Sequence, residues 1–190
     1  MLTIYEIDNL IPENYASIRE SKEYRDVCLS GLDKSEETVI VGPEGAGVEV
    51  VYKMLSDYYG ERALCLASSS LSAKQVETAT DETITLFEMV GDDYDDYAMQ
   101  VLERELKGKE IVMIFATEKM PLDAIRFVIT AIDNVSIKFG KQIKMAFFVG
   151  AGKPQSAMAL EYIRAFAHRP VHVFDLLQCK QACEAKAEAC

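Results

Sequence analysis

The 190-residue sequence contains no tryptophan, only five prolines and only two histidines. No apolar run approaches the ~18 residues that a membrane-spanning helix needs, so we expect no transmembrane segment. No C-x-x-C pair occurs among the five cysteines, which excludes a zinc ribbon. Hydrophobic residues make up 49% and charged residues 27%. This balance is typical of a globular chain and excludes a disordered or fibrous one.

Basic residues are scarce relative to acidic ones. The chain has 20 Lys and Arg against 31 Asp and Glu, giving a net charge of −11. Because such a surface repels phosphate backbones, we expect protein partners and no nucleic acid. The first residues carry acids where a signal peptide carries Lys or Arg, so we expect a cytoplasmic protein.

From residue 38 onward, short apolar runs alternate with amphipathic segments of helical length. This alternation predicts an α/β fold: a three-layer α/β/α sandwich with a mainly parallel five-stranded sheet. The segment 84–90 fits either a sixth strand or a helix, and its composition favours a helix. The five expected strands are 38–42, 63–68, 110–116, 144–150 and 171–177.

The pattern divides the chain into three parts. We expect an N-terminal helical adaptor at 1–36, a main domain at 37–178 and a C-terminal helical tail at 179–190. Cys179, Cys183 and Cys190 fall on one face of the tail helix. That face favours helix packing, with metal or cluster binding, acylation and redox crosslinking as alternatives.

A glycine-rich loop, Gly-Pro-Glu-Gly-Ala-Gly, connects the first expected strand to the helix after it. Its glycines Gly42, Gly45 and Gly47 are the candidate phosphate-binding residues, because glycines let backbone N–H groups approach an anion at a helix start. The spacing matches the first part of the P-loop motif. However, Val48 replaces the lysine of that motif and Glu49 replaces its Ser or Thr. A turn kept for its geometry, a weak nucleotide loop and a dinucleotide loop remain as alternatives.

Four stretches from about residue 38 to 178 resemble, in their order and spacing, the ExeA/GspA-type branch of the AAA+ P-loop ATPases. This resemblance implies a P-loop ATPase fold and a role in secretion or pilus assemblies. The four stretches are VIVGPEGAGVEVVYKML, CLASSSLSAKQVETATDETITLFEMVG, EIVMIFATEKMPLDAIRFVITAIDN and KMAFFVGAGKP with IRAFAHRPVHVFDLL.

The sequence departs from that family at its reactive positions. Phe115 and Ala116 stand where the resemblance places the Walker B Asp-Glu pair, and Glu118 follows two or three residues too late. The sensor position offers only Gly-Ala-Gly at 150–152, and the family's lid of small helices is missing. Arg164 or Arg169 would match the family's trans-acting arginine.

Phosphoryl transfer depends on positioning and charge neutralisation, which these departures remove. We therefore expect a catalytically inactive ATPase-like protein, not an enzyme, that serves as a structural component of a larger homo- or hetero-oligomeric assembly. Catalytic residues and metal ligands are expected to be absent, and ATP or ADP to bind weakly if at all. The alternatives are a nucleotide-binding regulatory subunit without efficient hydrolysis and a Rossmann-like enzyme with another cofactor.

The segment GDDYDDYAM at 91–99 places four acids around two tyrosines. Acids in the first turn stabilise a helix N-terminus through the helix dipole, so the segment predicts a helix start. A docking patch for a basic partner is the alternative.

Overall fold

The computed structural model describes residues 37–42, 47–76, 83–152, 154–167 and 169–176. The expected adaptor at 1–36, the tail with its three cysteines and Gly45 lie outside these residues. Among the described residues, no helix has both the length and the apolar character needed to cross a membrane.

The described residues form a six-stranded sheet in the order β3-β2-β4-β5-β1-β6, and every neighbouring pair is parallel. The α/β fold with a parallel sheet is thus confirmed, with one strand more than expected. The strands are β1 (Glu37–Gly42), β2 (Ala63–Ala67), β3 (Ile84–Thr85), β4 (Ile111–Phe115), β5 (Lys144–Gly150) and β6 (Val171–Asp175).

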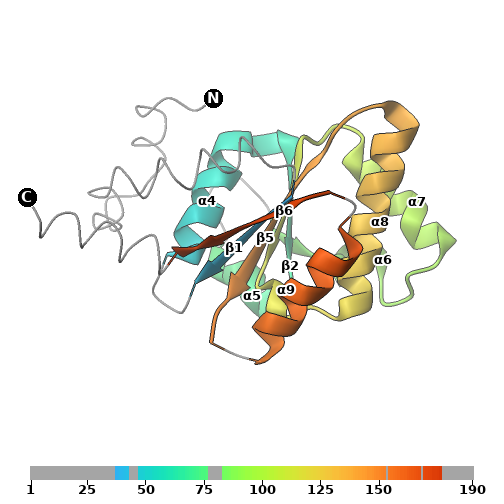
Figure 1. Ribbon diagram of the computed structural model, residues 1–190. Helices are drawn as coiled ribbons and strands as arrows, with labels where there is room; N and C mark the ends of the chain where they lie inside the picture. Colours follow the sequence, from blue (N-terminus) through green and yellow to red (C-terminus); the bar gives the residue numbers. More distant parts are fainter. Residues whose placement is uncertain (1–36, 43–46, 77–82, 153, 168, 177–190) are drawn as a thin grey trace, which may run out of the picture.

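Helices cover both faces of the sheet, which gives the three layers seen in Figure 1. Side chains of α4 (Val48–Tyr59) and α5 (Ser70–Val76) join the buried cluster on one face. Side chains of α6 (Leu86–Val90), α7 (Asp96–Leu106), α8 (Leu122–Phe139) and α9 (Pro154–Phe166) join the cluster on the other face.

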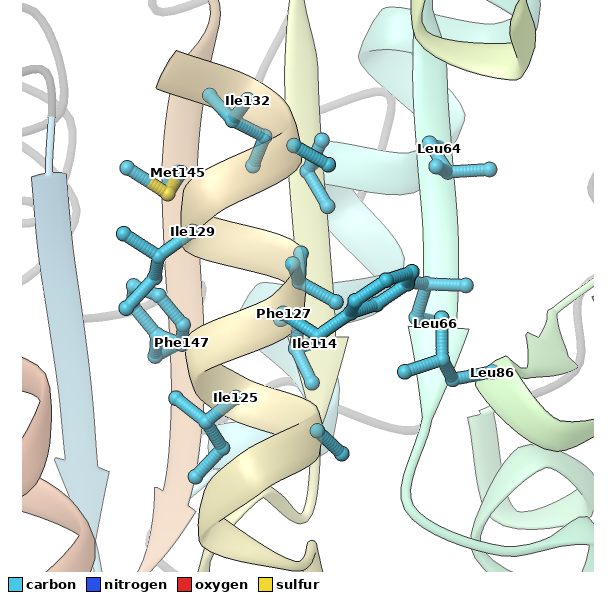
Figure 2. Close-up of a cluster of buried hydrophobic side chains, with 14 of the residues drawn as sticks. Leu64, Leu66, Leu86, Ile114, Ile125, Phe127, Ile129, Ile132, Met145 and Phe147 are labelled. Atoms are coloured by element: carbon cyan, nitrogen blue, oxygen red, sulfur yellow. The ribbon is translucent and has the colours of Figure 1, made fainter. Parts of the chain in front are cut away.

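The strands are apolar on both faces, as their sequences predict. Along β4, Val112 and Ile114 enter the cluster under α8, whereas Met113 and Phe115 enter the cluster under α4. Figure 2 shows Ile125, Ile129 and Ile132 of α8 together with strand residues such as Met145 and Phe147. Burial of both sheet faces is the main stabilising contribution in a fold of this kind.

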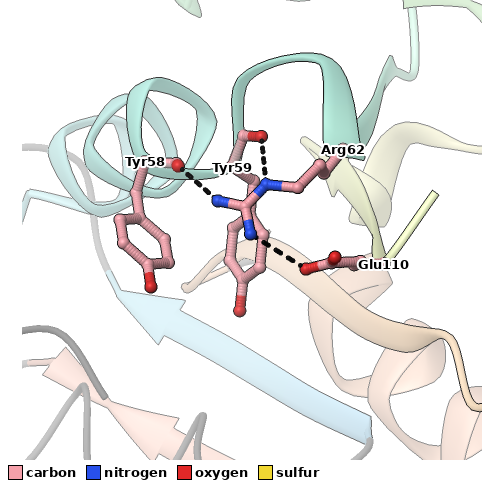
Figure 3. A network of polar contacts seen from close by, with 4 residues as sticks. All are labelled: Tyr58, Tyr59, Arg62 and Glu110. Atoms are coloured by element: carbon pink, nitrogen blue, oxygen red, sulfur yellow. Dashed lines mark hydrogen bonds and ion pairs between the residues drawn. The ribbon is translucent and has the colours of Figure 1, made fainter.

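Arg62, in the 3-10 turn Gly60–Arg62, ties the end of α4 to the start of β4 (Figure 3). Its guanidinium donates hydrogen bonds to the carbonyl oxygens of Tyr59 (3.2 Å) and Tyr58 (3.0 Å). It also pairs with Glu110 at 3.1 Å. The last carbonyl groups of a helix have no partner within the helix, so this cation caps the C-terminus of α4 at the amino end of the sheet.

The segment 84–90 is both strand and helix. Ile84–Thr85 pairs with β2, and Thr85 then caps α6 through a reciprocal capping box. The Glu88 N–H donates to the Thr85 Oγ1 at 3.0 Å, and the Glu88 carboxylate accepts from the Thr85 N–H at 2.7 Å. The sequence T-L-F-E at 85–88 carries this signature.

The capping box predicts a pH effect. Hydrogen bonds from the Thr85 N–H and hydroxyl hold the pKa of Glu88 below its ordinary value of 4.5. Since the folded-state pKa is the lower one, the carboxylate stabilises the fold above the ordinary pKa, and this contribution disappears as the pH falls through the folded-state pKa. In Thr85→Val, the pKa of Glu88 measured by NMR titration should rise toward its ordinary value. An unchanged titration would contradict the role of the hydroxyl.

Candidate functional site

All strands are parallel, so their carboxyl ends lie at one edge of the sheet. β1 and β5 are neighbours there, yet the helices that follow them cover opposite faces: α4 contributes to one buried cluster and α9 to the other. In open α/β sheets, ligands bind outside the carboxyl ends of the strands where successive connections diverge in this way. The topology therefore places the candidate site at the ends of β1 and β5.

The ends of these two strands are joined closely. Gly42 and Gly150 are partners in the parallel register. Beyond the ladder, the Ala151 N–H donates to the Gly42 carbonyl oxygen at 2.8 Å. The carboxyl ends of β1 and β5 therefore lie side by side.

A carboxylate completes this arrangement. Glu118 follows β4 in the 3-10 turn Thr117–Lys119 and is buried, with only 8% of its surface exposed. Its Oε2 accepts the Gly150 N–H at 2.9 Å. We call the group of Gly42, Gly150 and Glu118 the β1/β5 edge.

The turn that brings Glu118 back to the edge is unusual. Ala116 has a φ of 55°, and it is the one non-glycine residue with positive φ in the described part of the chain. The Thr117 hydroxyl fixes the turn by donating to the Ile114 carbonyl oxygen at 2.8 Å. Because the left-handed conformation costs an alanine of order 1–3 kcal/mol, the fold must compensate for this turn.

Two of the three predicted glycines can be located. Gly42 is the last residue of β1 and is buried, and Gly47 precedes α4. Gly47 has a φ of 94°, a conformation that only glycine adopts readily, and its carbonyl oxygen accepts the N–H groups of Val50 and Val51. Gly45 lies outside the described residues.

The structure also explains the two substituted P-loop positions. Val48 is 6% exposed and belongs to the buried cluster under α4. Its side chain contributes to the core and brings no charge to the edge. Glu49 is half-buried in the first turn of α4.

The two arginines proposed as trans-acting groups lie elsewhere. Arg164 is exposed in the last turn of α9, and Arg169 lies just before β6, at the amino end of the sheet. Arg169 lines a pocket of about 620 Å³ together with Asp133, Asn134 and Lys141. This pocket lies opposite the β1/β5 edge.

Sequence reasoning noted Glu118 but placed it too late to reach the site. The chain turns back after β4 through the left-handed conformation of Ala116, so Glu118 reaches the end of β5. Gly150 has no polar side chain, as the sequence shows, and it holds Glu118 through its backbone N–H instead.

No protein-family model and no curated protein sequence matches this chain. Solved structures do match. Bacteroides Pif1 bound to single-stranded DNA is 13% identical, with 82% of this chain and 41% of that chain covered at a TM-score of 0.54. The Bacteroides Pif1 helicase with ADP-AlF3 and single-stranded DNA is 14% identical, with 82% and 41% covered and a TM-score of 0.54. The Pif1 helicase from Candida albicans is 15% identical, with 82% and 39% covered and a TM-score of 0.54.

The fold is P-loop NTPase-like. This chain spans about two fifths of the length of those helicases, and at this identity the likeness shows the fold alone. The P-loop NTPase-like fold expected from the sequence is confirmed, whereas the finer resemblance to the ExeA/GspA-type branch stays a prediction.

The comparisons correct two expectations. We expected a protein without enzymatic activity, but the solved structures with this fold are helicases, which are enzymes. The expectation rested on counting side chains that the sequence lacks, and such a count does not decide whether a chain of this fold is an enzyme. We also excluded nucleic acid from the net charge alone, yet neighbours of this fold are bound to single-stranded DNA. Net charge is an average over the chain and does not decide what one surface binds.

Proposed function

We propose that this chain is a nucleotide-binding, P-loop-type subunit of a larger protein assembly, with a slow nucleotide triphosphatase activity that depends on Glu118. The observation that carries the proposal is the β1/β5 edge, where two glycine-ended strands and a buried carboxylate meet at the point of diverging connections. The polyphosphate would lie against the backbone N–H groups at the start of α4, since the first N–H groups of a helix have no partner within it.

Glu118 is the residue we propose for proton transfer. A buried carboxylate held by a backbone N–H is fixed in position, and a fixed carboxylate can orient water and accept its proton. The buried Val48 cannot neutralise the phosphates as a lysine would. Turnover should therefore be slow.

Magnesium fits this site only together with the nucleotide. No group of three or more acidic, histidine or cysteine side chains within the described ranges could hold a metal ion. Mg²⁺ is commonly held largely by substrate phosphates and water, so the nucleotide would supply its main ligands here. When bound, the ion would neutralise phosphate charge.

The assembly part of the proposal has two supports. The chain spans about two fifths of the helicases that share its fold, so a domain of this size acts there within a larger protein. The four stretches that resemble secretion and pilus ATPases favour a cell-envelope assembly as the setting.

Nucleotide binding is testable by thermal unfolding. At a hundred times its dissociation constant, Mg-ATP or Mg-ADP should stabilise the protein by about 2.7 kcal/mol and raise the melting temperature. Glu118→Gln should keep this shift, while phosphate release falls by about a hundredfold or more, because the amide cannot accept the proton.

Glu161→Gln is the matched control, because Glu161 is exposed on α9. It should change neither measurement. Absence of a melting shift at millimolar nucleotide would contradict the proposal and favour a scaffold that binds no nucleotide. Turnover that is equal in wild type and Glu118→Gln would remove Glu118 from the reaction.

A further inference from the structure

Two large apolar side chains are exposed on the helices that follow β2 and β3. Leu71 in the first turn of α5 is 73% exposed, and Phe87 in α6 is 64% exposed. Their chain neighbours are connected, since the Ser70 hydroxyl donates to the Glu88 carboxylate at 3.4 Å. This hydrogen bond joins the two helices that carry the exposed apolar side chains, and such side chains on connected helices favour an interaction surface.

The acidic segment continues from Phe87. The Gly91 N–H donates to the Phe87 carbonyl oxygen at 2.8 Å and ends α6, so Asp92 and Asp93 follow directly. Both are exposed, and neither forms an ion pair with any residue that the structure describes. We call Leu71, Phe87, Asp92 and Asp93 the α5–α6 rim.

The segment at 91–95 is anchored on α8 through Tyr94. The Tyr94 ring stacks on Phe127 of α8 with a centroid distance of 4.9 Å. Burial, with Asp123 and Asp92 nearby, raises the pKa of Tyr94, so its hydroxyl stays neutral. Asp95 is used as the cap of α7, where its Oδ1 accepts the Ala98 N–H at 2.8 Å, which confirms the helix start predicted for this segment.

Charge decides what kind of partner fits the rim. The exposed carboxylates of Asp92 and Asp93 attract cations and repel phosphates and other carboxylates. A partner that suits both the acids and the apolar side chains carries cations beside apolar groups.

We infer that the α5–α6 rim docks a lysine- or arginine-rich segment of a partner protein, whose apolar side chains pack on Leu71 and Phe87 and whose cations face Asp92 and Asp93. The apolar contact supplies the affinity, since a few central anchors carry most of the energy of an interface. The aspartates make binding specific for basic partners and raise the association rate. This inference stands apart from nucleotide binding, because none of the four residues belongs to the β1/β5 edge.

The test uses the full chain and a fluorescent helical peptide of lysine and leucine, measured by fluorescence anisotropy. Leu71→Ser with Phe87→Ser should weaken binding about tenfold. Asp92→Asn with Asp93→Asn should weaken it and reduce its dependence on salt. Ile137→Ser, which alters a side chain that is 81% exposed on α8, should leave binding unchanged.

All the altered side chains are exposed, so we expect the variants to fold. Thermal unfolding of each variant checks this expectation. The inference would be overturned if Ile137→Ser weakened peptide binding as much as the variants of the α5–α6 rim. It would also be overturned if a peptide with serine in place of leucine bound as tightly as the original peptide. Binding of a single-stranded oligonucleotide that the Leu71→Ser, Phe87→Ser variant abolishes would also overturn it and assign the rim to nucleic acid. Nucleotide-induced stabilisation should be the same in all these variants.

Discussion

Replacing Phe148 by alanine should lower the free energy of unfolding by about 3–5 kcal/mol, a large share of the 5–15 kcal/mol that a domain usually has. Phe148 lies in β5, which has β1 on one side and β4 on the other, and none of its surface is exposed. Its ring meets Tyr52 of α4 edge to face at 5.0 Å. Removal leaves a cavity between the central strands and α4 that neighbouring strands cannot close.

Denaturant unfolding measures this loss, and Phe139→Ala provides the control. Phe139 ends α8, is 54% exposed, and has the Lys107 ammonium over its ring at 5.4 Å. Since an exposed cation–π contact contributes about 0.5–1 kcal/mol, this variant should lose no more than that. Equal losses in the two variants would show that Phe148 is not packed as described.

Gly150→Ala should disturb both stability and turnover, because the added Cβ meets Glu118. A Cβ built at Gly150 lies 3.0 Å from the Glu118 Oε1, so the carboxylate must give way by a few tenths of an ångström. This strains the hydrogen bond from the Gly150 N–H, and loss of that bond would cost about 1–3 kcal/mol for a buried group left unpaired. Under the proposed function, turnover should fall by up to about a hundredfold, because Glu118 is displaced from its position.

Gly108→Ala is the matched substitution. A Cβ at Gly108 meets nothing within 4 Å, so this variant should unfold at nearly the wild-type denaturant concentration and retain its turnover. Comparable destabilisation of the two variants would mean that the contact between Gly150 and Glu118 is unimportant.

The parallel sheet could be predicted because its strands are buried on both faces. Runs such as IVMIF at 111–115 are apolar without alternation, and the amphipathic segments between them have helical length. The sixth strand was harder to predict, because Ile84–Thr85 has only two residues and leads directly into a capped helix. A segment this short does not establish the period of a strand.

The candidate site was predicted in part. Gly42 and Gly47 were named as candidates because glycines let backbone N–H groups approach an anion at a helix start, and phosphate binding there stays a prediction. Glu118 was not assigned to the site, because its position depends on the left-handed turn at Ala116. Alanine rarely adopts a positive φ, so the sequence does not predict this turn. The hydrogen bond to Gly150 joins residues 32 positions apart, a contact that no local pattern contains.

The most direct test of nucleotide binding at the β1/β5 edge is the change in backbone amide NMR signals when Mg-ADP is added to the isotope-labelled full chain. The account predicts that the largest changes fall on Gly42, Gly47 and Gly150, while Gly140 and Lys141, at the opposite pocket, stay unchanged. Changes confined to Gly140 and Lys141, or no changes at millimolar nucleotide, would contradict it.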